Sequence, residues 1–267
     1  MPDLKIPEPA ERLFSRVFQN LTQRHTEVIT FRKLAALGQQ PAIASLSAEN
    51  YKFALSLLND PQYDKFFKDR KGAVAFLGGP AAIGSLITSK QVSLFNAAVD
   101  AASLVFVHSA VDAALSDLCR VTYLIDPSRW RPFVESQKVA LSDLHATSTE
   151  ELWNSILEAY LTALERESLR KRTERLFGVC TPPREFDPIG NFKYDLISVE
   201  RLDKVRQDII HGSGPNTIHN CDAELEYLVK VGLYFFAMVN KAFGVKVNPL
   251  FALGLELPVA RGSKPDE

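Results

Sequence analysis

Apolar side chains recur at every third or fourth position over most of this chain, the spacing of helices that bury one face. The longest series follows residues 104–125. Strand patterns are scarce, because the apolar segments at 246–248 and 253–259 are brief or are interrupted by Gly254 and Pro258. The pattern therefore predicts an all-α fold.

Capping and turn residues divide this pattern into separate helices. Ser148 followed by Glu151, and a weaker variant at Ser47 and Asn50, are typical of helix starts. Gly178 and Gly212 are typical of helix ends. We expect helices over about residues 11–37, 48–58, 93–125, 133–144, 150–177, 199–211 and 223–243.

The sequence Gly78-Gly79-Pro80, with Gly84, interrupts the pattern before the longer helical region. We therefore predict a helical N-terminal region of unknown role over residues 1–90, a helical bundle over 91–245 and a C-terminal tail over 246–267. The last expected helix is nearly all apolar on one side, which indicates a buried packing element or part of a dimer face.

Composition is that of an ordinary globular protein. The chain has 267 residues, of which 46% are hydrophobic, enough for one large or two small domains. Its formal net charge is −1, so any contact with RNA must come from a local basic patch. Cys119, Cys180 and Cys221 are widely spaced and unpaired in number, which is typical of a reducing compartment. We expect a cytoplasmic protein.

We expect no membrane span or export signal. The N-terminus lacks the apolar run of a signal peptide. The most apolar region, residues 97–118, contains Asp100, His108, Asp112 and Asp117, so it resembles a buried helix more than a membrane span.

Candidate chemistry lies in the segment Val205 to Gly212, where Arg206 precedes His211 by five residues. The guanidinium of arginine can hold a phosphate and stabilise charge that develops on it. A neutral imidazole can accept a proton from a ribose 2′-hydroxyl near neutral pH. These are the two groups that RNA cleavage without a metal requires, so we interpret Arg206 and His211 as candidate catalytic residues.

Apolar positions before the pair and glycines after it place His211 on the last turn of a helix. Five residues correspond to about 140° around a regular helix, so Arg206 and His211 would not share a face there. Within one chain the pair needs a local distortion, which the glycines following His211 make easier.

The segment Arg206-Gln-Asp-Ile-Ile-His211-Gly212, at the end of a helix in an all-helical chain, resembles the motif of the HEPN superfamily. Gln207 occupies the polar position after the arginine. The resemblance covers roughly residues 93–244 by helix order and implies a HEPN-like bundle with an additional helical N-terminal region.

The resemblance also implies an activity. It points to a homodimer whose two motifs face each other and to a metal-independent endoribonuclease of the toxin or phage-defence type, which leaves a 2′,3′-cyclic phosphate. Arg206 would stabilise the phosphorane-like transition state. His211 would act as general base in one protomer and general acid in the other. An antitoxin or regulatory protein is a further expected partner.

Supporting roles fall to Gln207 and to His108 and Asp112, which lie four residues apart on one helix face. We interpret the last two either as a paired core histidine or as groups that orient the catalytic site. Asp203 gives Arg206 an alternative role, because it lies three residues earlier and could hold the guanidinium in a surface ion pair.

The densest basic run is the candidate RNA-binding patch. Its alternative interpretation is a solvated helix face, because acidic residues alternate with the basic ones at a spacing of four. The patch consists of Arg166, Arg170, Lys171, Arg172 and Arg175.

No cofactor and no metal are expected. The set His211, His219, Cys221 and Asp222 matches no common zinc spacing, and motifs for dinucleotides, P-loops or serine hydrolases are absent from the sequence. The alternative to an endoribonuclease is a catalytically silent helical-bundle module that binds RNA or a protein partner.

Overall fold

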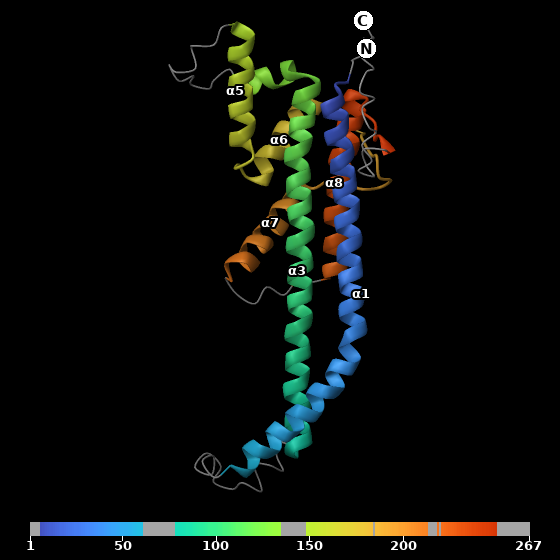
Figure 1. The fold of residues 1–267 in the computed structure, drawn as a ribbon, viewed down its shortest axis with the longest axis vertical. Helices are drawn as coiled ribbons and strands as arrows, with labels where there is room; N and C mark the ends of the chain where they lie inside the picture. Colours follow the sequence, from blue (N-terminus) through green and yellow to red (C-terminus); the bar gives the residue numbers. More distant parts are fainter. Residues whose placement is uncertain are drawn as a thin grey trace, which may run out of the picture.

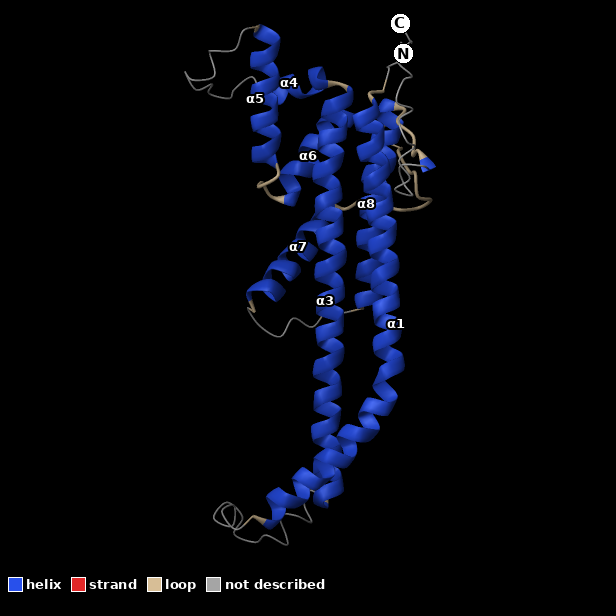
Figure 2. Cartoon of the chain, in the orientation of Figure 1, coloured by secondary structure: helices blue, strands red, loops and turns tan. Residues whose placement is uncertain are grey.

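The structure is a computed structural model that describes residues 6–60, 78–134, 148–183, 185–212, 218 and 220–249. Over these residues the regular structure is helical and no strand occurs, which confirms the all-α fold (Figure 2). Most of the expected helix 133–144 and of the tail 246–267 lies outside the described residues.

Two long antiparallel helices dominate the molecule (Figure 1). They are α1, Glu8–Asn59, and α3, Gly79–Ile125. The expected break between residues 37 and 48 is wrong, because α1 continues through Pro41. Proline removes one backbone hydrogen bond and bends a helix. The turns beyond it are nevertheless held on α3, where Asn50 and Ala54 are buried.

The boundary predicted near residue 90 falls inside α3, in the first quarter of that helix. Gly78 adopts the left-handed conformation, with φ of 76°, as the residue before the helix. Pro80 then lies in the first turn, where its missing N–H costs nothing. The glycine–proline segment therefore starts a helix that the pattern placed later. Among the described residues, α1 contributes Phe14 and Val17 to the same core as α3.

The remaining helices are shorter. A helix predicted over 150–177 is two helices, because Ser168 begins a new one by accepting a hydrogen bond from the N–H of Lys171. The cap at Ser148 is confirmed, since its hydroxyl accepts from the N–H of Glu151 at 3.1 Å. Gly178 does not end its helix, which runs on to Cys180. The elements are η2 Pro127–Trp130, α4 Arg131–Val134, α5 Thr149–Leu164, α6 Leu169–Cys180, α7 Leu196–His211 and α8 Cys221–Phe243.

The core fills the upper half of the molecule, where α8 packs on α3 and α1 (Figure 1). Gly232 on α8 allows close packing, because a β-carbon there would lie 3.1 Å from the Leu21 side chain. Trp130 is fully buried and donates through Nε1 to Thr122 Oγ1 at 3.2 Å, so it anchors the connection after α3. The shorter helices α6 and α7 cover another side of α3.

Below this core, α1 and α3 extend as a two-helix stalk, which we define as residues 33–59 and 79–99 (Figure 1). The side chains between its two helices are small or polar. Asn50 donates through Nδ2 to Thr88 Oγ1 at 3.0 Å and to Gln91 Oε1 at 2.8 Å. Gly84 lets the backbones approach, since a β-carbon there would lie 3.0 Å from the Tyr51 nitrogen.

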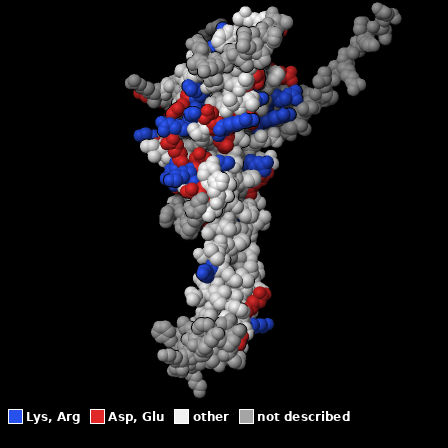
Figure 3. Space-filling view, turned by 90° about the vertical axis from the view of Figure 1, so that its left-hand side faces the viewer, with Lys and Arg blue, Asp and Glu red and all other residues white. Residues whose placement is uncertain are grey.

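Charge is distributed unevenly along the molecule. Lysine, arginine and acidic side chains of both signs gather over the upper part of the face in Figure 3, and the stalk below shows few of them. Among the described helices, α3 alone is long and apolar enough to cross a membrane by length and composition. Much of α3 also belongs to the core of the bundle.

Candidate functional site

The helix that carries the candidate catalytic pair is α7, and local signals define both its ends. Asp195 caps its start by accepting hydrogen bonds from the N–H groups of Ile197 and Ser198 at 3.2 Å and 3.0 Å. Gly212 follows its last residue in the left-handed conformation, with φ of 64°. The prediction that His211 lies on the last turn of a helix is confirmed.

Arg206 lies on the side of α7 that packs against the bundle. Its Nη1 atom is 3.6 Å from Asp203 Oδ1, one turn earlier on the same helix. The side chain is 21% exposed, and its Nε atom is buried without a hydrogen-bond partner among the described residues. The ion pair that sequence reasoning kept as an alternative for Arg206 is therefore formed.

His108 on α3 meets the same carboxylate. Its Nε2 atom lies 3.4 Å from Asp203 Oδ1, and its side chain is 1% exposed. Burial lowers the pKa of His108 below its usual value, because an imidazolium loses its hydration there. The charge of Asp203 opposes this shift and that of Arg206 adds to it. Asp203 thus bridges α3 and α7.

A second buried contact connects α6 to α3. Arg172 forms an ion pair with the carboxylate of Asp112, and its Nη1 atom donates to Ser116 Oγ at 2.7 Å and to the backbone oxygen of Asp112 at 3.3 Å. The Arg172 side chain is 7% exposed, so this guanidinium belongs to the interior.

The two contacts form one electrostatic cluster. The charges of Asp112 and Arg172 also act on the pKa of His108, in opposite directions. We call the set His108, Asp112, Arg172, Asp203 and Arg206 the polar cluster. It joins α3 to α6 and α7, which lie far from α3 in the sequence.

His211 stands apart from this cluster. It is exposed at the end of α7, as is Gln207. The helix continues to His211, so the loosened last turn that would bring the pair together in one chain is absent from the described backbone. On a regular helix five residues span about 140°, which places Arg206 and His211 on different faces.

The five residues of the candidate RNA-binding patch do not form one free basic surface. Arg170 pairs with Glu174 at 2.8 Å and with Glu200 at 3.1 Å. Lys171 pairs with Glu167 at 2.9 Å.

The other three lie in different surroundings. Arg172 is part of the polar cluster, Arg175 lies over the Phe133 ring at 4.9 Å, and Arg166 is exposed. Opposite charges alternate over this part of the surface, as Figure 3 shows.

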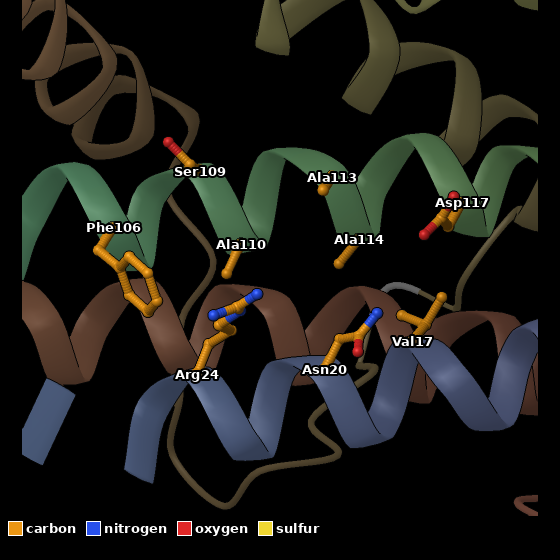
Figure 4. Close-up of a pocket in the computed structure, with 9 residues that line it drawn as sticks. All are labelled: Val17, Asn20, Arg24, Phe106, Ser109, Ala110, Ala113, Ala114 and Asp117. Carbon is orange, nitrogen blue, oxygen red and sulfur yellow. The ribbon is translucent and has the colours of Figure 1, made fainter. Parts of the chain in front are cut away.

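Two features escaped sequence reasoning. The contact between His108 and Asp203 joins residues that are far apart in the chain, and so does that between Arg172 and Ser116; no periodicity signals either. The second feature is a groove of about 330 Å³ between α1 and α3, where Arg24 and Asn20 face Phe106 and Asp117 (Figure 4). Ala110 and Ala113 line the groove. In the sequence pattern these alanines look like any other apolar positions of a helix, so the groove could not be predicted from them.

No family model, curated protein or solved structure matches the chain. Within the described ranges, no group of three or more His, Cys, Asp or Glu side chains could hold a metal ion. His219, from the set considered for zinc, lies outside those ranges. The function must therefore be inferred from the geometry of the site itself.

Proposed function

We propose that the protein is a metal-independent endoribonuclease of the HEPN type whose active site is completed by a second copy of the chain. The observation that carries the proposal is the placement of Arg206 and His211 on the last two turns of one helix. One is held in position by an ion pair and the other is exposed at a helix end.

Each group suits one part of the reaction. A neutral His211 accepts the proton of a ribose 2′-hydroxyl, and the 2′-oxygen attacks the adjacent phosphorus. The bond from phosphorus to the 5′-oxygen breaks, and an imidazolium donates its proton to that oxygen. The products are a 2′,3′-cyclic phosphate and a 5′-hydroxyl. Arg206 stabilises the charge on the phosphorane-like transition state.

The geometry favours a site in which the two groups come from different chains. Arg206 and His211 of one chain lie on different faces of α7, so one chain does not present both to the same phosphate. A second copy of the chain would have to bring its own His211 to the Arg206 of the first, on the side of α7 where Asp203 lies.

The first test is cleavage of total RNA by the purified protein in EDTA. Arg206→Lys and His211→Ala should each reduce the rate by at least about a hundredfold, the usual contribution of a positioned acid, base or charge-stabilising group. Arg201→Ala, on the same helix, and His25→Ala, on α1, are the matched controls and should cleave at the wild-type rate. Equal rates in all five proteins would refute the proposal.

A second test addresses the need for two chains. A heterodimer of one Arg206→Lys chain and one His211→Ala chain, purified with two affinity tags, retains one intact pair across the dimer. It should recover a substantial fraction of the activity that both parent variants lack. If each site used one chain only, this heterodimer would be as inactive as its parents.

A second candidate function is that of a helical-bundle module that binds a protein partner. It is favoured by one observation, the weakly charged stalk with its exposed apolar side chains, which catalysis at α7 does not use. An interaction module would show no cleavage in any variant, and its binding would depend on α1 and α3 rather than on Arg206.

A further inference from the structure

A groove follows one side of the α1/α3 pair from the upper bundle into the stalk. Three cavities lie along it. Phe106 lines both the first and the second, and the surface of α1 from Phe31 to Leu34 leads from the second to the third. From Asp117 to Gln91 on α3 the groove spans roughly 39 Å at the rise of an α-helix. We call it the hairpin groove.

The hairpin groove lies on the side of α3 away from the core. Val111 is buried beside Gly232 of α8. Ala113, which lines the groove, is about 200° further around the helix. The groove thus lies on the opposite side of the α1/α3 pair from α8.

Large apolar side chains stand open along this groove. Leu34 is 63% exposed, Phe95 49%, Phe31 47% and Phe106 38%. All four line one of its connected cavities. Aligned exposed aromatic groups of this kind mark surfaces that bind another protein.

We propose that a second copy of this chain occupies the hairpin groove and that the two α1/α3 pairs form a homodimer. The surface complements itself, because large side chains alternate with gaps. Ala35, Gly38 and Ala42 form depressions beside Leu34 and Phe95. A β-carbon added at Gly38 would meet nothing within 4 Å. A two-fold interface needs both projections and depressions on the same surface.

The available area fits a dimer. Two neighbouring helices roughly 39 Å long and about 10 Å apart present about 800 Å². That is the area that each partner buries in a protein interface of standard size.

Charge favours a second copy over a charged ligand. Residues 34–48 of α1 and 91–99 of α3 contain no charged side chain. Two copies would therefore face each other over this part without like-charge repulsion, whereas a nucleic acid would find no cation there. This proposal does not rest on ribonuclease activity, because it is tested without RNA.

The test is the molar mass in solution over a range of concentrations, measured by sedimentation equilibrium. Wild type should have twice the chain mass. Leu34→Glu and Phe95→Glu, in the groove, should shift the mass towards one chain and raise the dissociation constant at least a hundredfold, with unchanged helical circular dichroism.

The matched controls lie on the same helices but do not line the groove. Leu37→Glu and Leu86→Glu replace side chains that are 75% and 72% exposed, and both should remain dimeric. A wild type that is monomeric throughout the range, groove variants that stay dimeric, or controls that dissociate equally would overturn the proposal. A monomer that instead floats with phosphatidylcholine vesicles would also overturn it and assign the surface to lipid.

Discussion

Replacing glycine by alanine at two positions in the stalk should change the free energy of unfolding in opposite directions. At Gly84 a β-carbon would lie 3.0 Å from the nitrogen and 3.1 Å from the α-carbon of Tyr51, which are backbone atoms that cannot rotate away. Gly84→Ala should therefore lower the free energy of unfolding by about 1–3 kcal/mol. Urea unfolding measures the change.

Gly38→Ala is the control for this substitution. It meets no atom of its own chain within 4 Å, so at concentrations where the chain is monomeric it should raise the free energy of unfolding by roughly 0.5–1 kcal/mol through helix propensity. The same effect at both positions would contradict the close approach of α1 to Gly84.

His108 makes stability depend on pH. Its pKa is lowered in the folded protein by burial, so below the ordinary histidine pKa of about 6.5 the unfolded chain binds a proton that the folded chain does not. His108 therefore leaves the free energy of unfolding unchanged above that pH. As the pH falls towards the lowered pKa of the folded protein, the free energy of unfolding decreases. Stability should fall by at most about 1.4 kcal/mol per pH unit in this window.

Comparison with His108→Phe isolates this effect. The variant retains the other titrating groups, so urea unfolding at a series of pH values should show a shallower decrease below pH 6.5 than in wild type. Identical slopes in the two proteins would mean that His108 takes up its proton equally in both states.

Single residues also show the limit of sequence reasoning. The end of α7 at His211 follows from Gly212, a local signal, and the sequence predicted it. Asp203 was identified as the partner of Arg206 because they are one turn apart. Its contact with His108 depends on how α7 lies on α3, which no nearby residue encodes.

Among the helices, we expect the polar cluster to stabilise the packing of α6 on α3. Arg172 is buried and bound to Asp112, so Asp112→Ala leaves a charge without its partner and should cost about 3 kcal/mol. Replacement of both, by Asp112→Ala and Arg172→Met, should cost less than the sum of the single changes. Thermal unfolding of all four proteins gives the coupling energy; additive costs would show that the pair does not interact.

Element boundaries were predicted where local chemistry sets them and missed where packing does. Ser148 caps α5 as expected. Pro41 lies between two helices that were predicted to be separate, and Gly78-Gly79-Pro80 was interpreted as a boundary, yet the first lies inside α1 and the second starts α3. The cost of a proline within a helix is offset by burial of later turns on the partner helix, and that offset is not local.

For the whole molecule, the uneven core predicts a gradient of stability. The stalk buries few side chains, among them Asn50, Ala54, Gly84 and Thr88, whereas α8 buries an almost continuous apolar face. Amides of the stalk should therefore exchange with solvent through local opening at a lower free energy than those of α8. Native-state hydrogen exchange measures both.

Protein concentration adds a second variable to that experiment. If two copies meet through the hairpin groove, protection of the stalk should increase with concentration while that of α8 changes little. Stalk amides that exchange only by global unfolding at every concentration would contradict the gradient.

The sequence by itself determined the helical class and the position of α7 and α8, and it supplied Arg206 and His211 as candidates. These depend on periodicity and on capping residues that act over a few positions. Only the tertiary structure decided that α1 and α3 are continuous, that Arg206 faces the polar cluster while His211 faces away, and that a groove stays open beside α3. The physical reason is that burial and ion pairing between helices depend on which distant surfaces meet, and in this chain some of those surfaces, such as Phe14 and Phe236, lie more than two hundred residues apart.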